Sequence, residues 1–485
     1  MQQRKKFFMM RGGLLLCLLF PSILTAQPSP LSLSDALSVA LSDNPTIRNA
    51  CDAVGGAAYE VDIAESEFGF RLSPQATSGL GSDTETSQST ILSLSKKFAT
   101  GTTVELASGT SATEKSFYRS FSGITVSQSL LRGFGPLLHT NNVVNAKRGI
   151  TSASRQWELA KEQVGMDVIT NFYRIIGQKL VLGVWERSWE RAQKLLAASQ
   201  AKMERGLTTK IDIFRAQTQA ATAEASMLDA QEALQEAKDT LKILLGKEFA
   251  EELEVESQII PAALKEGEAE LVETALQRRV DLQEAADQVK DAQRNARIAE
   301  RSLFPDLRIG FNYALTGRGN SFTDSTAFDN SRFRVLFSTS IPLNLGAERA
   351  RSRQKKLEVL RKKREFAELQ KRATQEVRQA LRHVATVERR IAIQEKNVQA
   401  TQANLELANL RFERGYADLF EVLRAEESLT QAQKEEITLR IEQVITALRL
   451  RRATGLLGPF LDTIVAGGMQ QTTCPQPAED SDLFE

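Results

Sequence analysis

The chain has 485 residues, 42% hydrophobic and 25% charged, and its 62 Lys and Arg nearly balance its 61 Asp and Glu. Nucleic-acid binding needs a concentrated basic surface, so this balance argues against nucleic acid as a partner. The sequence has no nucleotide-binding glycine motif, zinc-protease motif or CxxC pair, and only two histidines. We therefore expect no enzyme activity, no cofactor and no metal site.

Residues 1–26 have the pattern of a secretory signal peptide, in which basic residues come before an apolar run and a small residue marks the cleavage point. The apolar run here is 14–20, the small residue is Ala26, and the basic residues are Arg4, Lys5, Lys6 and Arg11. The alternative, a transmembrane anchor, would need a longer apolar run to span a bilayer. Removal of the segment leaves 58 Lys and Arg against 61 Asp and Glu.

Two cysteines remain in the mature chain, Cys51 and Cys474. They could form one disulfide, because a signal peptide implies an oxidising compartment. Their wide separation in the sequence favours two unpaired thiols instead.

Strand-like segments are expected within about residues 73–131 of the first half, 27–246. Residues 89–109 predict a hairpin that turns at Ala99-Thr100-Gly101. This hairpin could be an added pair of strands, or part of longer strands with an exposed loop. The segment "GITVSQSLL", from Gly123, predicts a further strand.

A helical hairpin is expected next, at about residues 141–245. Its first run, 141–203, has no proline and is rich in helix-forming residues, so it predicts a rod of roughly 95 Å. The second run begins near Asp212. Helices this long and this polar need partners laid alongside them to bury their narrow apolar stripes.

The second half repeats this order after a connecting segment at 247–267. Residues 268–456 are expected to hold strands at about 305–343 and a helical hairpin at about 347–455. Within that hairpin the helical runs are 347–412 and 421–452. Residues 457–485 are expected to form a flexible tail.

The strand segments of the second half alternate between large apolar and polar residues. Leu307, Ile309 and Phe311 fall on one face, with Arg308 and Asn312 on the other. This period of two predicts a strand with a lipid face and a wet face. The alternative is an amphipathic hairpin packed on a soluble core.

Two internal matches show that the chain is a duplication. "ERGLTTKIDIFRA" from Glu204 matches "ERGYADLFEVLRA" from Glu413 at an offset of 209 residues, and a segment from Leu41 matches one from Leu276 at an offset of 235. Because these two offsets differ, most of the extra length of the first half must lie between residues 74 and 121. Each Glu-Arg-Gly segment is the expected tip of a helical hairpin.

In their order, several segments resemble the TolC family of outer-membrane efflux proteins. They are "LSLSDALSVALSDNPTIRNA", the strand ending in "VSQSLLRGFG", "SLFPDLRIGFNY" and the two tips. The resemblance runs from about Leu31 to Gly455 and implies a mainly α fold with a transmembrane β part. Three copies, with about four strands each, would share a twelve-stranded outer-membrane barrel above a periplasmic α-barrel. An open four-stranded sheet cannot remain unpaired in lipid, which agrees with a shared barrel.

The resemblance also implies sites at the tips. Six residues occupy positions that contact a periplasmic adaptor protein: Gly206, Leu207, Thr208, Gly415, Tyr416 and Ala417. Asp212 matches a gate-locking carboxylate, although the arginine that usually partners it would fall at Ala417 and is missing. Glu421 matches an acidic position at the pore constriction, where Arg424 stands in place of a second acid. We expect Glu421 and Arg424, three residues apart, to interact on one helix.

The sequence therefore predicts an outer-membrane channel of a tripartite efflux or type I secretion system, extending into the periplasm. The implied partners are two further copies of the chain, outer-membrane lipid, a periplasmic adaptor (membrane fusion) protein and an inner-membrane pump of RND or ABC type. The alternative is a periplasmic coiled-coil structural or adaptor protein without a pore, which would not account for the alternating strands.

Overall fold

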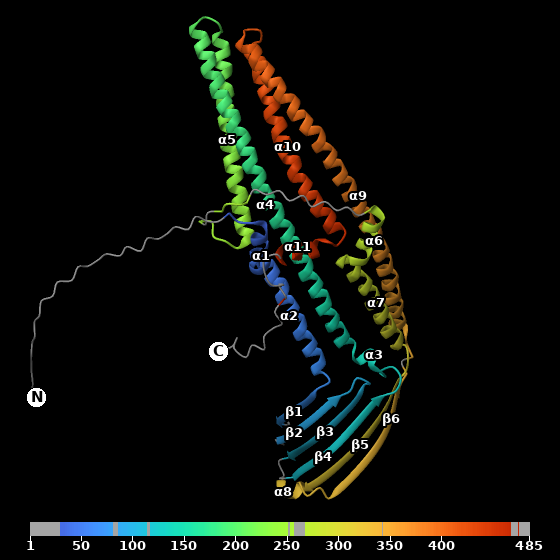
Figure 1. Cartoon of the computed structure of the whole chain (residues 1–485). Helices are drawn as coiled ribbons and strands as arrows, with labels where there is room; N and C mark the ends of the chain where they lie inside the picture. Colours follow the sequence, from blue (N-terminus) through green and yellow to red (C-terminus); the bar gives the residue numbers. More distant parts are fainter. Residues whose placement is uncertain are drawn as a thin grey trace, which may run out of the picture.

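The computed structural model describes residues 30–80, 86–113, 117–250, 253–256, 267–341, 343–466 and 474. A β-sheet lies at one end of the molecule, and long helices run from it to two hairpin tips at the other end (Figure 1). The expected signal peptide, 1–26, lies outside the described residues, as do parts of the connecting segment 247–267 and most of the residues after 466.

The duplication is visible in the short helices that open each half. α1 (Leu33–Asp43) and α2 (Pro45–Ser66) correspond to α6 (Glu268–Arg278) and α7 (Val280–Arg301), and the paired helices have equal lengths of 11 and 22 residues. The side chain of Asn44 caps α2, and Pro45 suits its first turn because proline needs no partner for a missing N–H there. These pairs keep the offset of 235 residues that the sequence predicts.

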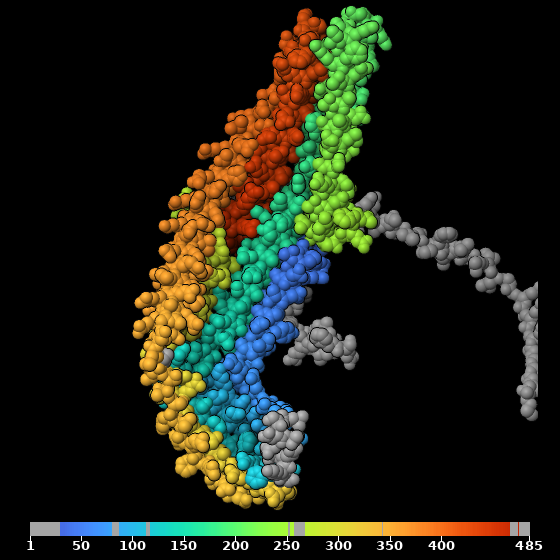
Figure 2. Space-filling view, turned by 180° about the vertical axis from the view of Figure 1, so that it is seen from behind, coloured from blue at the N-terminus to red at the C-terminus, as the bar shows by residue number. Residues whose placement is uncertain are grey.

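The long helices follow the expected bounds closely. α4 (Asn141–Glu204) and α5 (Lys210–Leu245) form the first hairpin, and α9 (Gly346–Glu413) and α10 (Leu419–Ala453) form the second. α10 lies between α9 and α4, so the two hairpins pack as one unit (Figure 2). Within the described ranges, no helix combines the length and the hydropathy that a membrane span requires.

The sheet has six strands in the described part of the chain, where the sequence predicted about four. They are antiparallel and lie in chain order: β1 (Phe70–Leu80), β2 (Thr86–Lys97), β3 (Thr102–Thr113), β4 (Phe117–Ser129), β5 (Asp306–Gly319) and β6 (Asn330–Ser340). The 89–109 segment is therefore an added pair of strands, β2 and β3. Two short helices flank the sheet, α3 (Pro136–His139) and α8 (Phe322–Ser325).

The largest core lies at the middle of α4, where α1, α5 and α10 meet it. Phe172 and Tyr173 are almost fully buried there, against Leu37, Leu241 and Leu448. The start of the expected flexible tail differs from the prediction, because residues 457–466 form helix α11 (Leu457–Ala466). Its apolar face adds three residues to this core: Leu457, Leu461 and Val465.

The two cysteines of the mature chain form a disulfide, so the preference for unpaired thiols was wrong. Cys51 on α2 is bonded to Cys474, and their Cα atoms are 5.7 Å apart. Separation in sequence is a poor guide here, because α11 returns the end of the chain to α1, next to α2. The bond ties the last described residue to the helix that leads into β1.

Candidate functional site at the hairpin tips and the sheet

Both hairpin tips have the same backbone turn. Gly206 and Gly415 have φ angles of +71° and +78°, in the left-handed region that side chains disfavour. The N–H of Gly206 donates to Met203 O (2.8 Å), and that of Gly415 donates to Phe412 O (3.1 Å). In each tip the next N–H, of Leu207 or Tyr416, donates five residues back. This pattern is the Schellman ending of a helix, as the repeated glycines predict.

The second helix of each hairpin begins with an equivalent cap. Thr209 caps α5 and Asp418 caps α10, each accepting from the backbone N–H three residues later. Those third residues are Asp212 and Glu421, the two carboxylates predicted for the gate and the pore constriction. A carboxylate in the first turn is favoured in any helix, because it faces the positive end of the helix dipole.

The carboxylate of Asp212 is bound within its own tip. It accepts hydrogen bonds from the hydroxyls of Thr209 (2.6 Å) and Thr208 (3.1 Å), and Arg215 lies 3.5 Å away. The hydrogen bond from Thr209 is the main cause that lowers the pKa of Asp212, so the group is ionised at neutral pH. Ala417, where the resemblance implies an arginine, is instead partly buried against the core of the second tip.

Glu421 and Arg424 do not form the expected pair. Glu421 Oε1 accepts from Arg411 Nη1 at 2.6 Å, across the second tip from α9. The guanidinium of Arg424 instead lies over the ring of Phe420, 4.8 Å from its centroid. The first-turn position directs Glu421 back towards the end of α9, where it pairs with Arg411.

The two tips are held together by side chains from both halves. Lys202, on α4, donates to Phe412 O (2.7 Å) and lies 3.6 Å from the centroid of the Phe412 ring. Arg191 pairs with Glu426 further along the same interface. A shared apolar cluster includes Ala216 of α5 and Leu419 of α10. The tips therefore form one packed end rather than two independent turns.

Five exposed apolar residues lie at this end, of which the sequence analysis named Leu207 and Tyr416 but missed Ile211, Phe214 and Phe420. Leu207 and Tyr416 project from the turns, with exposed fractions of 71% and 76%. Ile211, Phe214 and Phe420 line a groove between α5 and α10 and are also exposed. The signal was available, because Ile211 and Phe420 occupy the same place in the two repeats at the offset of 209 residues.

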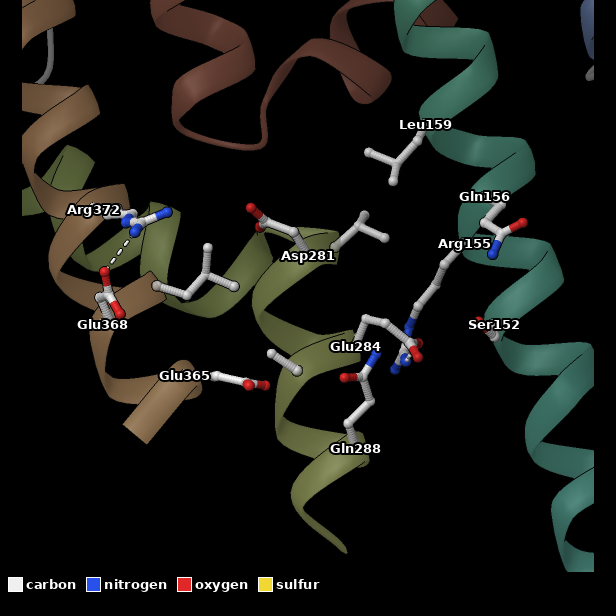
Figure 3. Close-up of a pocket in the computed structure, with 13 residues that line it drawn as sticks. Ser152, Arg155, Gln156, Leu159, Asp281, Glu284, Gln288, Glu365, Glu368 and Arg372 are labelled. Atoms are coloured by element: carbon white, nitrogen blue, oxygen red, sulfur yellow. Dashed lines mark hydrogen bonds and ion pairs between the residues drawn. The ribbon is translucent and has the colours of Figure 1, made fainter. Parts of the chain in front are cut away.

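A second hollow lies nearer the sheet, between α4, α7 and α9 (Figure 3). Arg155 extends from α4 to Glu284 (2.8 Å) and Asp287 (2.9 Å) on α7, and Arg148 joins Glu284 at 2.7 Å. Partial burial opposes ionisation of Glu284, but hydrogen bonds from Arg148 and Arg155 outweigh it and lower its pKa. This charged cluster links two helices of different halves.

The sheet carries an apolar stripe across all six strands. Paired residues share a face, and the registers align the stripe from β1 to β6. Its members are Phe70, Leu72, Leu92, Leu94, Val104, Leu106, Ile124, Val126, Phe311, Tyr313, Phe333, Val335 and Phe337. Many are exposed, with values of 71% for Phe70 and 76% for Phe333. The opposite face carries Arg71, Ser95, Glu105, Asn312 and Arg334.

Comparison with known proteins finds the same fold in solved outer-membrane channels. The family model described as outer membrane efflux protein matches residues 271–456. The outer membrane protein VceC of Vibrio cholerae superposes with a TM-score of 0.67 and 18% identity, covering 87% of this chain and 96% of that chain. The MtrE outer membrane channel of Neisseria gonorrhoeae gives 0.68 and 16%, covering 87% and 89%.

The CmeC outer membrane channel of Campylobacter jejuni gives a TM-score of 0.66 at 14% identity, covering 87% of this chain and 85% of that chain. At such identities the structural likeness establishes the fold. No curated protein matches the chain in sequence.

Proposed function

Since residues 271–456 match the family model described as outer membrane efflux protein, we propose that the chain is the outer-membrane channel of a tripartite export system. The protein is located in the outer membrane, with its helices extending into the periplasm. In this role it conducts solutes passively to the outside, from an inner-membrane pump of RND or ABC type and a periplasmic adaptor.

The proposal rests on one observation: the two ends of the molecule have different chemistry. One end is a sheet whose exposed face is a continuous apolar stripe, and the other is a pair of equivalent polar turns. An exposed apolar face of this extent fits lipid contact. A periplasmic adaptor or a coiled-coil protein would have no use for such a face.

The proposed assembly is a homotrimer. In the described sheet, β1 and β6 each have one neighbouring strand, so their outer backbone groups need partners. Open edges are not tolerated in lipid, where no water can satisfy the N–H and C=O groups. Copies of the same chain supply those partners when β6 of one copy pairs with β1 of the next.

The tips have two roles in this proposal. The turns Gly206-Leu207-Thr208 and Gly415-Tyr416-Ala417 contact the adaptor, and the exposed Leu207 and Tyr416 offer apolar anchors for it. Asp212, Glu421 and Arg424 belong to the constriction or its gate. The division into repeats at 27–246 and 268–456, joined by 247–267, is part of the same proposal.

Membrane fractionation followed by native mass spectrometry in detergent tests the proposal. We expect the chain in the outer-membrane fraction, as a trimer, with a far-ultraviolet circular dichroism spectrum dominated by helix. A cysteine at Leu207 or Tyr416 should cross-link to an adaptor, whereas one at the exposed Leu357, far along α9, should not. A stable monomer, or a chain recovered with soluble periplasmic proteins, would refute the proposal.

A further inference from the structure

The hairpin of β2 and β3 separates two strands that the duplication would make neighbours. In the second repeat β5 pairs directly with β6. Their counterparts in the first repeat, β1 and β4, lie at either side of the added hairpin in the order β1-β2-β3-β4. The hairpin is thus inserted into the wall of the sheet rather than attached to its rim.

The pairing of the hairpin is continuous on both sides. β2 pairs with β1 from Thr86 to Lys96, and β3 pairs with β4 from Thr102 to Thr113, with no residue skipped. The hairpin also carries its share of the apolar stripe through Leu92, Leu94, Val104 and Leu106. A loop excluded from the membrane would have no reason to continue that stripe in register.

The turn of the hairpin is built into the junction between sheet and helices. The N–H of Gly135, in the link from β4 to α3, donates to Thr100 O at 3.1 Å, and Gln128 Nε2 donates to the same oxygen at 3.3 Å. Gly101 has a φ of +89°, and a Cβ there would clash with the His139 ring and lie 2.9 Å from Gly133 O. Only glycine fits this position.

We propose that three copies of this six-stranded sheet close an eighteen-stranded outer-membrane wall, in place of the twelve strands implied by the family resemblance. The inference rests on the proposed trimeric channel and specifies its exit. With strands about 4.8 Å apart and tilted by about 40°, eighteen strands give a wall roughly 36 Å across and twelve give roughly 24 Å. The exit is therefore about 1.5 times wider than a twelve-stranded one.

The inner face of the added strands keeps this width open. On the face opposite the stripe, the hairpin carries mainly small side chains: Ser89, Ser93, Ser95, Thr103, Ala107, Gly109 and Ser111. The larger side chains on this face are Ile91, Lys97 and Glu105. Among the residues that the structure describes, the helices join the sheet only at β1, β4, β5 and β6, so the added strands widen the wall without adding a helix to the tunnel. The exit then does not limit the size of the cargo, which the constriction at the tips sets instead.

Cysteine accessibility in intact outer membranes tests this placement. Ser95→Cys and Ala107→Cys face the lumen in the proposed wall, whereas Leu94→Cys and Leu106→Cys face lipid. The native cysteines of the mature chain are held in their disulfide. We expect a membrane-impermeant thiol reagent to label the first two variants and to spare the other two. Labelling of all four in a trimer that stays in the outer membrane would overturn the eighteen-stranded wall and leave the proposed function standing.

Cryo-electron microscopy in nanodiscs gives the strand count directly. We expect eighteen strands in the full chain and a narrower, twelve-stranded wall in a variant lacking residues 86–113, because β1 and β4 are then free to pair as β5 and β6 do. Twelve strands in the full chain, with β2 and β3 outside the wall, would refute the inference. Recovery of both proteins as monomers would refute the proposed function instead.

Discussion

At the scale of single residues, the two tips share a backbone but differ in their side-chain links. Lys202 and Arg411 are equivalent at the offset of 209 residues, as are Asp212 and Glu421. Arg411 pairs with Glu421 inside its own hairpin, whereas Lys202 reaches across to Phe412 and leaves Asp212 to its threonine partners. The second tip is therefore linked within its own hairpin, whereas the first tip is linked to the second.

The tip glycines should matter for function before they matter for folding. Gly206→Val or Gly415→Val forces a branched side chain into a left-handed turn, which costs about 1 kcal/mol or more. A Cβ at either position would meet no atom within 4 Å, so the strain stays local. We expect loss of adaptor cross-linking and of efflux, with normal outer-membrane insertion.

Gly149→Ala is the matched control for these variants, because Gly149 lies within α4 and a Cβ there is also unobstructed. It should retain both efflux and cross-linking. The assignment of the tips would be contradicted if the valine variants failed to reach the outer membrane but still engaged the adaptor.

The constriction hypothesis now centres on Arg411 as well as Arg424. If three Glu421 carboxylates line a narrow pore, they set the local potential there. Arg411→Gln removes their direct partner and should raise cation selectivity most, Arg424→Gln should raise it less, and Glu421→Gln should lower it. Reversal potentials across a salt gradient in planar bilayers measure the effect. Unchanged potentials in all three variants would place these residues outside the pore.

At the scale of elements, the charged cluster fixes α4 against α7. Two arginines of one helix face three carboxylates of the other: Arg148 and Arg155 against Glu284, Asp287 and Asp291. All five are largely shielded from water, so screening by salt weakens them less than it weakens surface pairs. The cluster stabilises the wall of helices above the sheet, where Figure 3 shows Arg155 reaching Glu284.

This cluster should make stability depend on pH in the acid range. The pKa values of Glu284 and Asp287 are lowered in the folded protein, so their contribution is present above the unfolded values. It is lost as the pH falls through the folded values. Glu284→Gln should reduce stability by about 1.5–3 kcal/mol at pH 7, because hydrogen bonds to charged groups are worth that amount.

Thermal unfolding at pH 7 and at pH 3 measures this dependence. The difference in melting temperature between wild type and Glu284→Gln should shrink at the lower pH. Glu358→Gln is the control, because Glu358 pairs with Lys355 on the same helix and joins no second element. An equal loss at both pH values would show that Glu284 acts through packing and not through its charge.

Helices and strands differ in how far the sequence predicts them. The bounds of α4 and α9 are confirmed within one residue, because runs without proline and rich in helix formers leave few alternatives. The sequence could not decide whether residues 89–109 form an added pair of strands, because alternation shows which side chains share a face of a strand but not which strand lies beside it. The partners of Glu421 and Cys51 depend on contacts across the fold, which no local pattern encodes.

At the scale of the whole molecule, the strand pairing between the two repeats of one chain predicts the strand pairing between neighbouring chains. These two boundaries are the internal seam and the subunit seam. β4 of the first repeat pairs with β5 of the second. In the proposed trimer β6 pairs with β1 of the next copy, which joins equivalent strands in the same order. Val126 lies opposite Phe311 in the internal seam. Val126 lies three residues before the end of β4, and its counterpart three residues before the end of β6 is Phe337. Phe311 corresponds to Ala76 at the offset of 235 residues. Phe337 and Ala76 are therefore the expected partners between subunits.

A disulfide across the subunit seam tests this register. The pair Ala76→Cys with Phe337→Cys should give covalent trimers on non-reducing gels, since directly paired residues in adjacent strands have Cβ atoms about 4.5–5.5 Å apart. Ala76→Cys with Leu336→Cys is the control, because Leu336 points to the opposite face. Equal cross-linking in both pairs would show that the seam has no fixed register.

In the proposed trimer, the equivalence of the two seams means that the complete ring would be built from six half-length units, two from each polypeptide. The internal seam and the subunit boundary repeat the same contact, so around its axis the helical tunnel approximates six-fold symmetry. The wall does not, because only the first unit of each pair carries the added hairpin, and units of four strands alternate with units of two. A protein that binds around the helical tunnel would meet six similar positions, whereas a protein that binds the strands of the wall would meet three.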